Sequence, residues 1–463
     1  MKNTKKFFKF IVNNKLKSLS IFIIFLGLTS FIGAWSAVSG GHDKQNKVIL
    51  FFKGIIPTPI YQKARDTIFI IPHLKERNKF YKTQVDKYEQ GLNGNLFNTE
   101  IFTSQIQKKK FELKEFFLPF KRLDLTLGWH GEENSRRAHH FEIIDNKVFV
   151  ISGEAQTIYF DKKNIFKKKL EQIEIPNNLF DILEETNSKL IGIRDLYYED
   201  RKIYISMLSQ NDKGLTINAY QADINYDELI FETFFQTNEY WSVYNVYSGG
   251  RLEKYKDNKI LFSIGFNGVW PSGQSFDSKF GKIIAIDKNT SDYEFISIGH
   301  RNPQGLKYID DHNIIINTEH GPKGGDEINI NYLNENNDRI PNYGWAVASY
   351  GVNYTGPDTL LKSHEKHGFD EPFKWYTPAI GISQLEFLDK KYSQAKKNYL
   401  FVSSLRAGSI YIYEMNEKLD KILEEDRIYF HAKRIRDLKY DKETGLFFII
   451  FEFTPSIAVL KIL

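Results

Sequence analysis

The chain contains no cysteine. This absence excludes disulfide staples, thiol catalysis and metal sites built from cysteine, although a large β protein can fold without staples. An excess of one charge is also missing, because 63 Lys and Arg residues are balanced by 58 Asp and Glu residues, leaving a net charge of +5. So small a surplus gives no electrostatic footprint for nucleic acid, and we expect no nucleic-acid partner.

Apolar and aromatic residues, in contrast, are plentiful. Aromatic residues make up 15% of the 463 residues and charged residues 26%, a balance that provides a packed core. A chain of this length could hold about two or three average domains, although an all-β propeller of this size can form one unit. We expect one large β domain with an appendage.

The N-terminal segment has the pattern of a membrane anchor. Six lysines between residues 2 and 17 precede an apolar run over residues 19–38, which approaches the ~20 residues that span a bilayer and exceeds a signal-peptide core. By the positive-inside rule, we expect a cytoplasmic basic tail over residues 1–18, an uncleaved transmembrane signal anchor over residues 19–38, and the remaining chain on the periplasmic or extracellular side of the inner membrane. A cleaved signal peptide is the alternative, because residues 34–37 (AWSA) form an imperfect cleavage site.

The composition changes twice after the anchor. Residues 39–121 carry many Lys, Gln, Asn and Glu residues with little strand alternation, so we expect a membrane-proximal stalk that can pack on the main domain. From residue 122 onward, short β-rich runs such as 147–151 (KVFVI) and 282–286 (KIIAI) are separated by turn residues. This spacing predicts a sandwich, a barrel or a propeller and argues against βαβ units. Periodicity alone leaves a propeller and tandem sandwiches equally open.

Residues 299–345 contain the most distinctive motifs. They are GHRNPQG at 299–305, EHGPKGGDEIN at 319–329 and NYGW at 342–345. Glycine permits positive φ and close approach of another group, and proline removes a backbone donor, so the carbonyls of Gly321 and Pro322 can face a cation. Calcium is bound by oxygen ligands that include backbone carbonyls. Taken singly, such loops are ordinary turns.

In their order and approximate spacing, these motifs resemble the glucose/sorbosone dehydrogenase family, six-bladed β-propellers that oxidise sugars with pyrroloquinoline quinone (PQQ) and calcium. The resemblance extends over about residues 181–463, with further matches at YSGGRL (247–252), PAIGIS (378–383), SSLRAG (403–408) and RIRD (434–437). It implies that the chain is all-β and that residues 122–463 form a six-bladed β-propeller.

The resemblance also implies a set of binding residues. PQQ carries carboxylates, which guanidinium groups bind through paired hydrogen bonds, and the matching positions are Arg301, Asn302, Arg406, Arg434 and Arg436. Calcium, held partly by the Gly321 and Pro322 carbonyls, would polarise the quinone carbonyl that receives hydride. Asp326, Glu327 and Tyr343 match a second, structural calcium site, for which turn capping and blade packing are equally open alternatives.

The proton-transfer side of the family pattern is altered. The family uses a histidine as base, and the residue at that position is Tyr247, whose phenol is a poor base unless a cation lowers its pKa. The resemblance leaves three alternatives: Tyr247 is activated by calcium or an arginine, another base such as His139, His140 or His300 replaces it, or oxidation is lost. The family aspartate after the Ile-Gly pair is also replaced, by Phe266. We expect His300, inside a motif, to orient its loop.

We therefore predict a membrane-anchored, exported oxidoreductase that oxidises an aldose or related alcohol with PQQ and calcium, and passes electrons to a membrane quinone or a cytochrome. The alternative is a non-catalytic carbohydrate- or partner-binding propeller that has lost the base and keeps the calcium loops for stability. A hydrolase on the same architecture has no visible pair of nucleophile and base. If the first prediction holds, the four arginines converge beside the Gly321 carbonyl.

Overall fold

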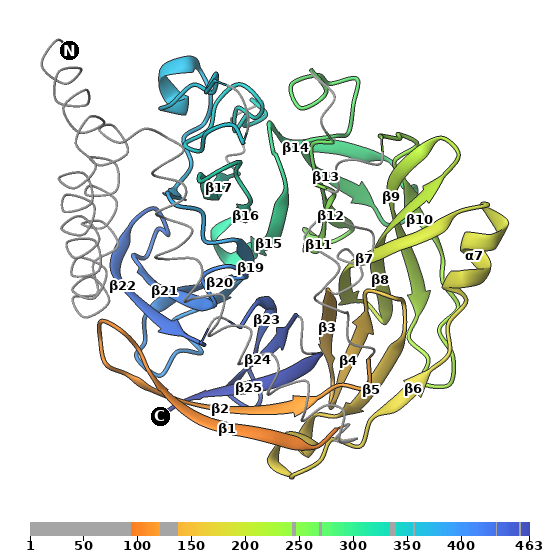
Figure 1. Cartoon of the computed structure of the whole chain (residues 1–463), viewed down its shortest axis with the longest axis vertical. Helices are drawn as coiled ribbons and strands as arrows, with labels where there is room; N and C mark the ends of the chain where they lie inside the picture. Colours follow the sequence, from red (N-terminus) through yellow and green to blue (C-terminus); the bar gives the residue numbers. More distant parts are fainter. Residues whose placement is uncertain are drawn as a thin grey trace, which may run out of the picture. The chain divides into compact units, whose positions relative to one another are not determined.

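The computed structural model describes residues 94–120, 138–242, 247–267, 271–333, 339–354, 357–431, 433–452 and 455–463. Most of these residues lie in six antiparallel sheets that are arranged in a ring (Figure 1). The innermost strands of successive sheets contact one another in a closed circle, from β3 through β7, β11, β15, β19 and β23 back to β3. The prediction of an all-β, six-bladed propeller is confirmed.

Five sheets each consist of four strands that follow one another in the chain from the inside outward. The first has β3 (His139–Ile144), β4 (Lys147–Ser152), β5 (Thr157–Asp161) and β6 (Ile173–Ile175), and the second has β7 (Lys189–Glu199), β8 (Lys202–Asn211), β9 (Gly214–Asp223) and β10 (Glu232–Gln236). The third has β11 (Gly249–Tyr255), β12 (Lys259–Ile264), β13 (Lys282–Asp287) and β14 (Tyr293–Ile298), and the fourth has β15 (Pro303–Ile309), β16 (Ile314–Glu319), β17 (Asp326–Tyr332) and β18 (Lys374–Tyr376). The fifth has β19 (Ile382–Leu388), β20 (Asn398–Ser404), β21 (Ser409–Met415) and β22 (Ile422–Tyr429).

The sixth sheet joins the two ends of the described chain. Its inner strands are β23 (Ile435–Asp441), β24 (Leu446–Phe451) and β25 (Ser456–Ile462), and its outer strands are β2 (Lys110–Phe117) and β1 (Leu96–Thr103). Figure 1 shows β1 and β2 in orange beside the blue strands of the C-terminal end. Strand β2 pairs with β25 along its length, from Phe111 opposite Ile462 to Phe117 opposite Ser456.

The predicted C-terminal boundary of the stalk, residue 121, is therefore wrong, because β1 and β2 belong to the propeller. The physical reason is an apolar alternation in β2: Phe111 and Leu113 are buried in one cluster with Phe401 and Ile412 of the fifth sheet, while the polar residues that alternate with them keep the segment hydrophilic in composition. The predicted tail, anchor and remaining stalk (residues 1–93) lie outside the described residues.

Helical structure is sparse in the described part of the chain. It contains the α-helix α7 (Leu179–Glu185) and the 3₁₀ turns η3 (Lys162–Phe166), η4 (Asp310–His312) and η5 (His364–His367). None of the helices within the described ranges is long and apolar enough to cross a membrane.

The apolar cores lie between neighbouring sheets. Ile151 of β4, for example, packs in one cluster with Ile203 and Ile205 of β8, because alternate side chains of a strand face opposite sides of its sheet. Polar side chains then remain at the axis-facing positions of the innermost strands, where the candidate site is built.

Candidate functional site

In five of the six innermost strands, the pairing with the next strand shifts register near the start of the strand. The shifts in β11, β15 and β23 lie at Arg251, Gln304 and Arg436, and β7 and β19 have comparable shifts. A β-bulge bends its strand and re-aims the side chains around it. These bulges bring polar residues of several sheets together at one end of the propeller.

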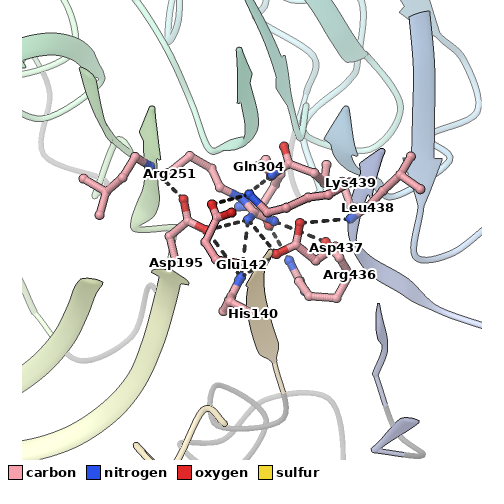
Figure 2. A network of polar contacts seen from close by, with 12 residues as sticks. His140, Glu142, Asp195, Arg251, Gln304, Arg436, Asp437, Leu438 and Lys439 are labelled. Carbon is pink, nitrogen blue, oxygen red and sulfur yellow. Dashed lines mark hydrogen bonds and ion pairs between the residues drawn. The ribbon is translucent and has the colours of Figure 1, made fainter. Parts of the chain in front are cut away.

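Arg251 lies at the centre of a buried polar cluster (Figure 2). Its Nη1 atom is 2.7 Å from Oδ1 of Asp195 on β7, 3.5 Å from Oδ2 of Asp437 on β23, and 3.3 Å from Nδ1 of His140 on β3. Strands β11 and β23 belong to the third and sixth sheets, so their side chains can meet only at the axis of the ring. We call these four residues the axial cluster.

By residue type, the axial cluster could also hold a metal ion. Ligand atoms of His140, Asp195 and Asp437 all lie within 4.8 Å of one another. The Arg251 guanidinium already lies among these atoms, however, and supplies the positive charge that the two carboxylates need. Burial lowers the pKa of His140 to about 3 despite its hydrogen bond with Asp437, so the ring is neutral. The axial cluster therefore already contains a cation, the Arg251 guanidinium, beside its two carboxylates.

A second charged layer lies farther along five of the innermost strands. Lys439 Nζ is 2.6 Å from Glu142 Oε1, and Lys307 Nζ lies 3.7 Å from Glu253 and 3.4 Å from Glu386. Burial raises the pKa of Glu142 to about 7, although the positive charge of Lys439 opposes it. Alternating charges thus fill the axis on the side away from the Gly-rich loops.

The axial cluster is connected to the residues predicted to contact a cofactor. Arg251 donates from Nε to the Gln304 carbonyl at 2.6 Å and from Nη2 to the Arg436 carbonyl at 3.2 Å. Arg436 Nη1 in turn donates to Gln304 Oε1 at 2.7 Å, and Gln304 Nε2 donates to Asn302 Oδ1 at 3.1 Å. Two of the predicted residues, Asn302 and Arg436, therefore share one hydrogen-bonded chain.

Glu452 holds two of the predicted arginines. Arg434 and Arg436 each donate from Nε to a different oxygen of its buried carboxylate, both at 2.6 Å. The sequence reasoning missed Glu452, as it missed Asp195 and Asp437. The only signal was an acid at the end of the apolar run LFFIIFE over residues 446–452.

Arg301, another of the predicted arginines, contacts two backbone carbonyls and two aromatic rings. Its Nη1 atom donates to the carbonyls of His320 at 3.0 Å and Gly321 at 2.8 Å. The guanidinium carbon lies 4.1 Å from the centroid of the Tyr247 ring and 5.2 Å from that of Trp345. Only 5% of the residue is exposed, and Nε is buried without a hydrogen-bond partner.

The motif loops around Arg301 are held by buried side chains. The ring nitrogens of His300 lie 2.7 Å from Ser297 Oγ and 3.0 Å from Glu319 Oε1, and Glu319 Oε2 accepts the Arg301 backbone N–H at 2.6 Å. These contacts give His300 the loop-orienting role that its motif predicted.

The residues predicted for a second calcium site make contacts of their own. Asp326 accepts backbone N–H groups from Gly321 at 3.2 Å and Ile382 at 3.0 Å, and the Tyr343 ring packs 5.0 Å from that of His300. Glu327 is buried, and burial raises its pKa well above the usual range, with the charge of Glu319 adding to the effect. Asp326 and Tyr343 thus make capping and packing contacts, and the second calcium site stays a prediction.

Arg406 is the exposed member of the arginine set, and its backbone N–H donates to the Ile380 carbonyl at 3.0 Å. The phenol of Tyr354 lies within electrostatic reach of both Arg301 and Arg406: burial raises its pKa, and the two guanidinium charges oppose the rise. Tyr354 was not predicted, and 63% of it is exposed. Arg406 and Tyr354 therefore mark the solvent side of the site, next to the buried Arg301.

None of the histidines suggested as a replacement base faces the site freely. His140 belongs to the axial cluster and His300 uses both ring nitrogens. His139 is buried beside Phe120, and burial lowers its pKa to about 4. The ring of Tyr247 lies over the guanidinium of Arg301; its correspondence to the family histidine stays a prediction from the resemblance.

Fold and site together define a six-bladed propeller whose loops gather arginines at one end of the axis, an arrangement suited to a small anionic ligand. The sequence profile of the Glucose / Sorbosone dehydrogenase family matches residues 145–456, and the chain belongs to this family.

Known relatives agree with this assignment. Aldose sugar dehydrogenase YliI of Escherichia coli is 28% identical over 264 residues, which cover 52% of this chain and 68% of that protein. An uncharacterised protein of Synechocystis is 28% identical over 214 residues, or 41% of this chain and 50% of its own length, so the chain matches about half of that relative.

Solved structures share the fold at lower identity. A crystal structure of glucose dehydrogenase has a TM-score of 0.59 at 20% identity and covers 71% of this chain and 97% of its own. The apo form of the soluble aldose sugar dehydrogenase of Escherichia coli has a TM-score of 0.57 at 20% identity, covering 70% and 95%. The PQQ-bound aldose sugar dehydrogenase of Streptomyces coelicolor has a TM-score of 0.51 at 17% identity, covering 76% and 98%.

Proposed function

We propose that this protein is a sugar dehydrogenase that oxidises an aldose or related alcohol with bound PQQ. The observation that carries the proposal is that the charges of Arg301 and Arg436 both reach His320, while Glu452 pairs Arg436 with Arg434 and Arg406 is exposed. The family relation to aldose sugar dehydrogenases, one of which is known in a PQQ-bound form, supports the choice of cofactor.

The residues of the site fit such an anionic cofactor. Arg406 has an exposed side chain, and Arg301 has a buried Nε–H without a partner, so both have donors available for carboxylates. Glu452 fixes the Nε atoms of Arg434 and Arg436 and leaves their charges only partly neutralised. When bound, PQQ would accept the hydride that leaves the sugar carbon.

The proposal extends to the setting of the reaction. The lysine-flanked apolar run over residues 19–38 supports a membrane anchor with the propeller on the exported side. A membrane quinone or a cytochrome is then the acceptor that would return the cofactor to its oxidised form.

The second candidate is a carbohydrate- or partner-binding propeller without turnover. It is favoured by Tyr247, which the resemblance aligns with the family base and which lies against Arg301. His300, both of whose ring nitrogens have buried partners, and His140, which is buried beside Arg251, favour it as well.

Dye reduction by the purified full-length protein separates the two functions. With PQQ and aldoses, we expect a redox dye to be reduced, and Arg406→Gln should lower the rate at subsaturating PQQ by about tenfold, since one charge-assisted contact is lost. The control is Arg201→Gln, a charge-matched change of an exposed residue between β7 and β8, at the other end of the propeller. Binding of PQQ without dye reduction would instead support the binding propeller.

A further inference from the structure

The Gly321 carbonyl already has a cationic partner in this chain. The resemblance assigns this carbonyl, with that of Pro322, to a calcium ion, yet it accepts a hydrogen bond from Arg301 Nη1 at 2.8 Å. The neighbouring His320 carbonyl accepts from the same nitrogen at 3.0 Å. A guanidinium stays charged at any physiological pH and offers donors in a fixed plane, so the acceptor is satisfied without a metal ion.

Arg301 is not free to leave this position. The Tyr247 and Trp345 rings lie 4.1 and 5.2 Å from the guanidinium carbon, and a cation beside aromatic rings gains from their negative faces, more so when it is desolvated. The Arg301 backbone N–H is fixed by Glu319 at 2.6 Å, so the start of the side chain is held as well. A calcium ion at Gly321 would lie next to this buried positive charge and be repelled by it.

We propose that Arg301 takes the place of calcium at the Gly321 carbonyl, and that the site binds its polycarboxylate ligand without calcium. The identity of that ligand as PQQ rests on the proposed function. Tyr247 is then a positioning residue that holds Arg301 against the carbonyls. This role would explain both departures from the family pattern, the tyrosine in place of the histidine and the arginine in place of calcium.

Metal binding can be measured without PQQ. Terbium, which binds to calcium sites, would be excited by Tyr247 and Trp345 if it bound at Gly321, so calcium-displaceable terbium luminescence reports the site on the full-length protein. We expect Arg301→Gln to gain this luminescence at least fivefold over the unmodified protein. Arg301→Lys keeps a positive charge and should gain none. An equal, calcium-displaceable signal in the unmodified protein and Arg301→Gln would overturn the proposal.

Cofactor binding gives a second readout, from PQQ titrations in EGTA and in calcium. The unmodified protein should bind with dissociation constants that agree within twofold, whereas Arg301→Gln should bind at least tenfold more weakly in EGTA and recover in calcium. Arg406→Gln is the matched control, since it removes a guanidinium that does not contact Gly321; it should weaken binding equally in both buffers. Calcium-dependent binding by the unmodified protein would refute the inference. Absence of PQQ binding in both buffers would refute the proposed cofactor, and the terbium comparison would then decide the inference alone.

Discussion

His139 and His140 are adjacent on β3 but have different surroundings. His140 lies in the axial cluster, whereas His139 is beside Phe120 and within electrostatic reach of Glu452 and Arg436. Successive side chains of a strand point to opposite faces, and both faces are buried here. Each ring is therefore kept neutral in the folded protein by the cost of burying a charge.

The low pKa of His139 predicts a pH-dependent stability. Burial lowers its pKa from 6.5 to about 4 in the folded state, so unfolding takes up a proton between these values and the free energy of unfolding falls as the pH decreases from about 6.5 towards 4. One proton corresponds to about 1.4 kcal/mol per pH unit. The free energy of unfolding, measured in urea, should fall between pH 6.5 and pH 5 in both proteins. For His139→Gln this fall should be about 1 to 2 kcal/mol smaller than for the unmodified protein.

Buried Glu142, whose raised pKa acts in the opposite direction, is present in both proteins and cancels in this comparison. His367→Gln, at an exposed position, is the control and should keep the pH dependence of the unmodified protein. Identical pH dependence of His139→Gln and the control would contradict a neutral, buried His139.

At the scale of elements, features within one contiguous segment could be predicted from the sequence, whereas features built from several distant segments could not. The motif loops and their arginines could be found because each loop is a contiguous segment with Gly and Pro at defined places. The axial cluster could not, because Asp195, Arg251 and Asp437 come from separate sheets, and the bulges beside them disturb the two-residue alternation that would reveal inward-facing positions. Strand β2 was missed because its partner β25 is at the other end of the chain.

The closure by β2 makes a prediction about truncation. Deletion of residues 1–90 keeps every described strand, so we expect one cooperative thermal transition within a few degrees of the full-length protein, together with release from the membrane fraction. Deletion of residues 1–119 also removes β1 and β2 with the buried Phe111, Leu113 and Phe116. Each such side chain contributes about 2 to 5 kcal/mol to the free energy of unfolding. The three contributions together are comparable to the whole stability of a typical domain.

We therefore expect the longer deletion to be insoluble or to lack a cooperative transition in circular dichroism. Equal melting of the two truncated proteins would show that the sixth sheet does not need its outer strands. If the shorter deletion remained with the membrane, the anchor predicted at residues 19–38 would be wrong.

At the scale of the whole molecule, Arg251 ties together sheets that do not adjoin. It contacts Asp195 in the second sheet, Gln304 in the fourth and Asp437 in the sixth, all from its own place in the third. A ring of sheets is otherwise held by contacts between neighbours, so this residue links opposite sides across the axis. Its own burial is compensated only while both carboxylates are present.

Removal of Arg251 should consequently weaken the entire propeller. Arg251→Met fills a similar volume but leaves two buried carboxylates without their cation, which costs about 3 to 5 kcal/mol in urea unfolding. Adding Asp195→Asn and Asp437→Asn removes the orphaned charges and should recover most of this loss, whereas Arg201→Met at the surface serves as the control for the substitution itself. If Arg251→Met were no more destabilising than the control, or if the triple variant were the least stable, the axial cluster would not be the ionic network that its geometry indicates.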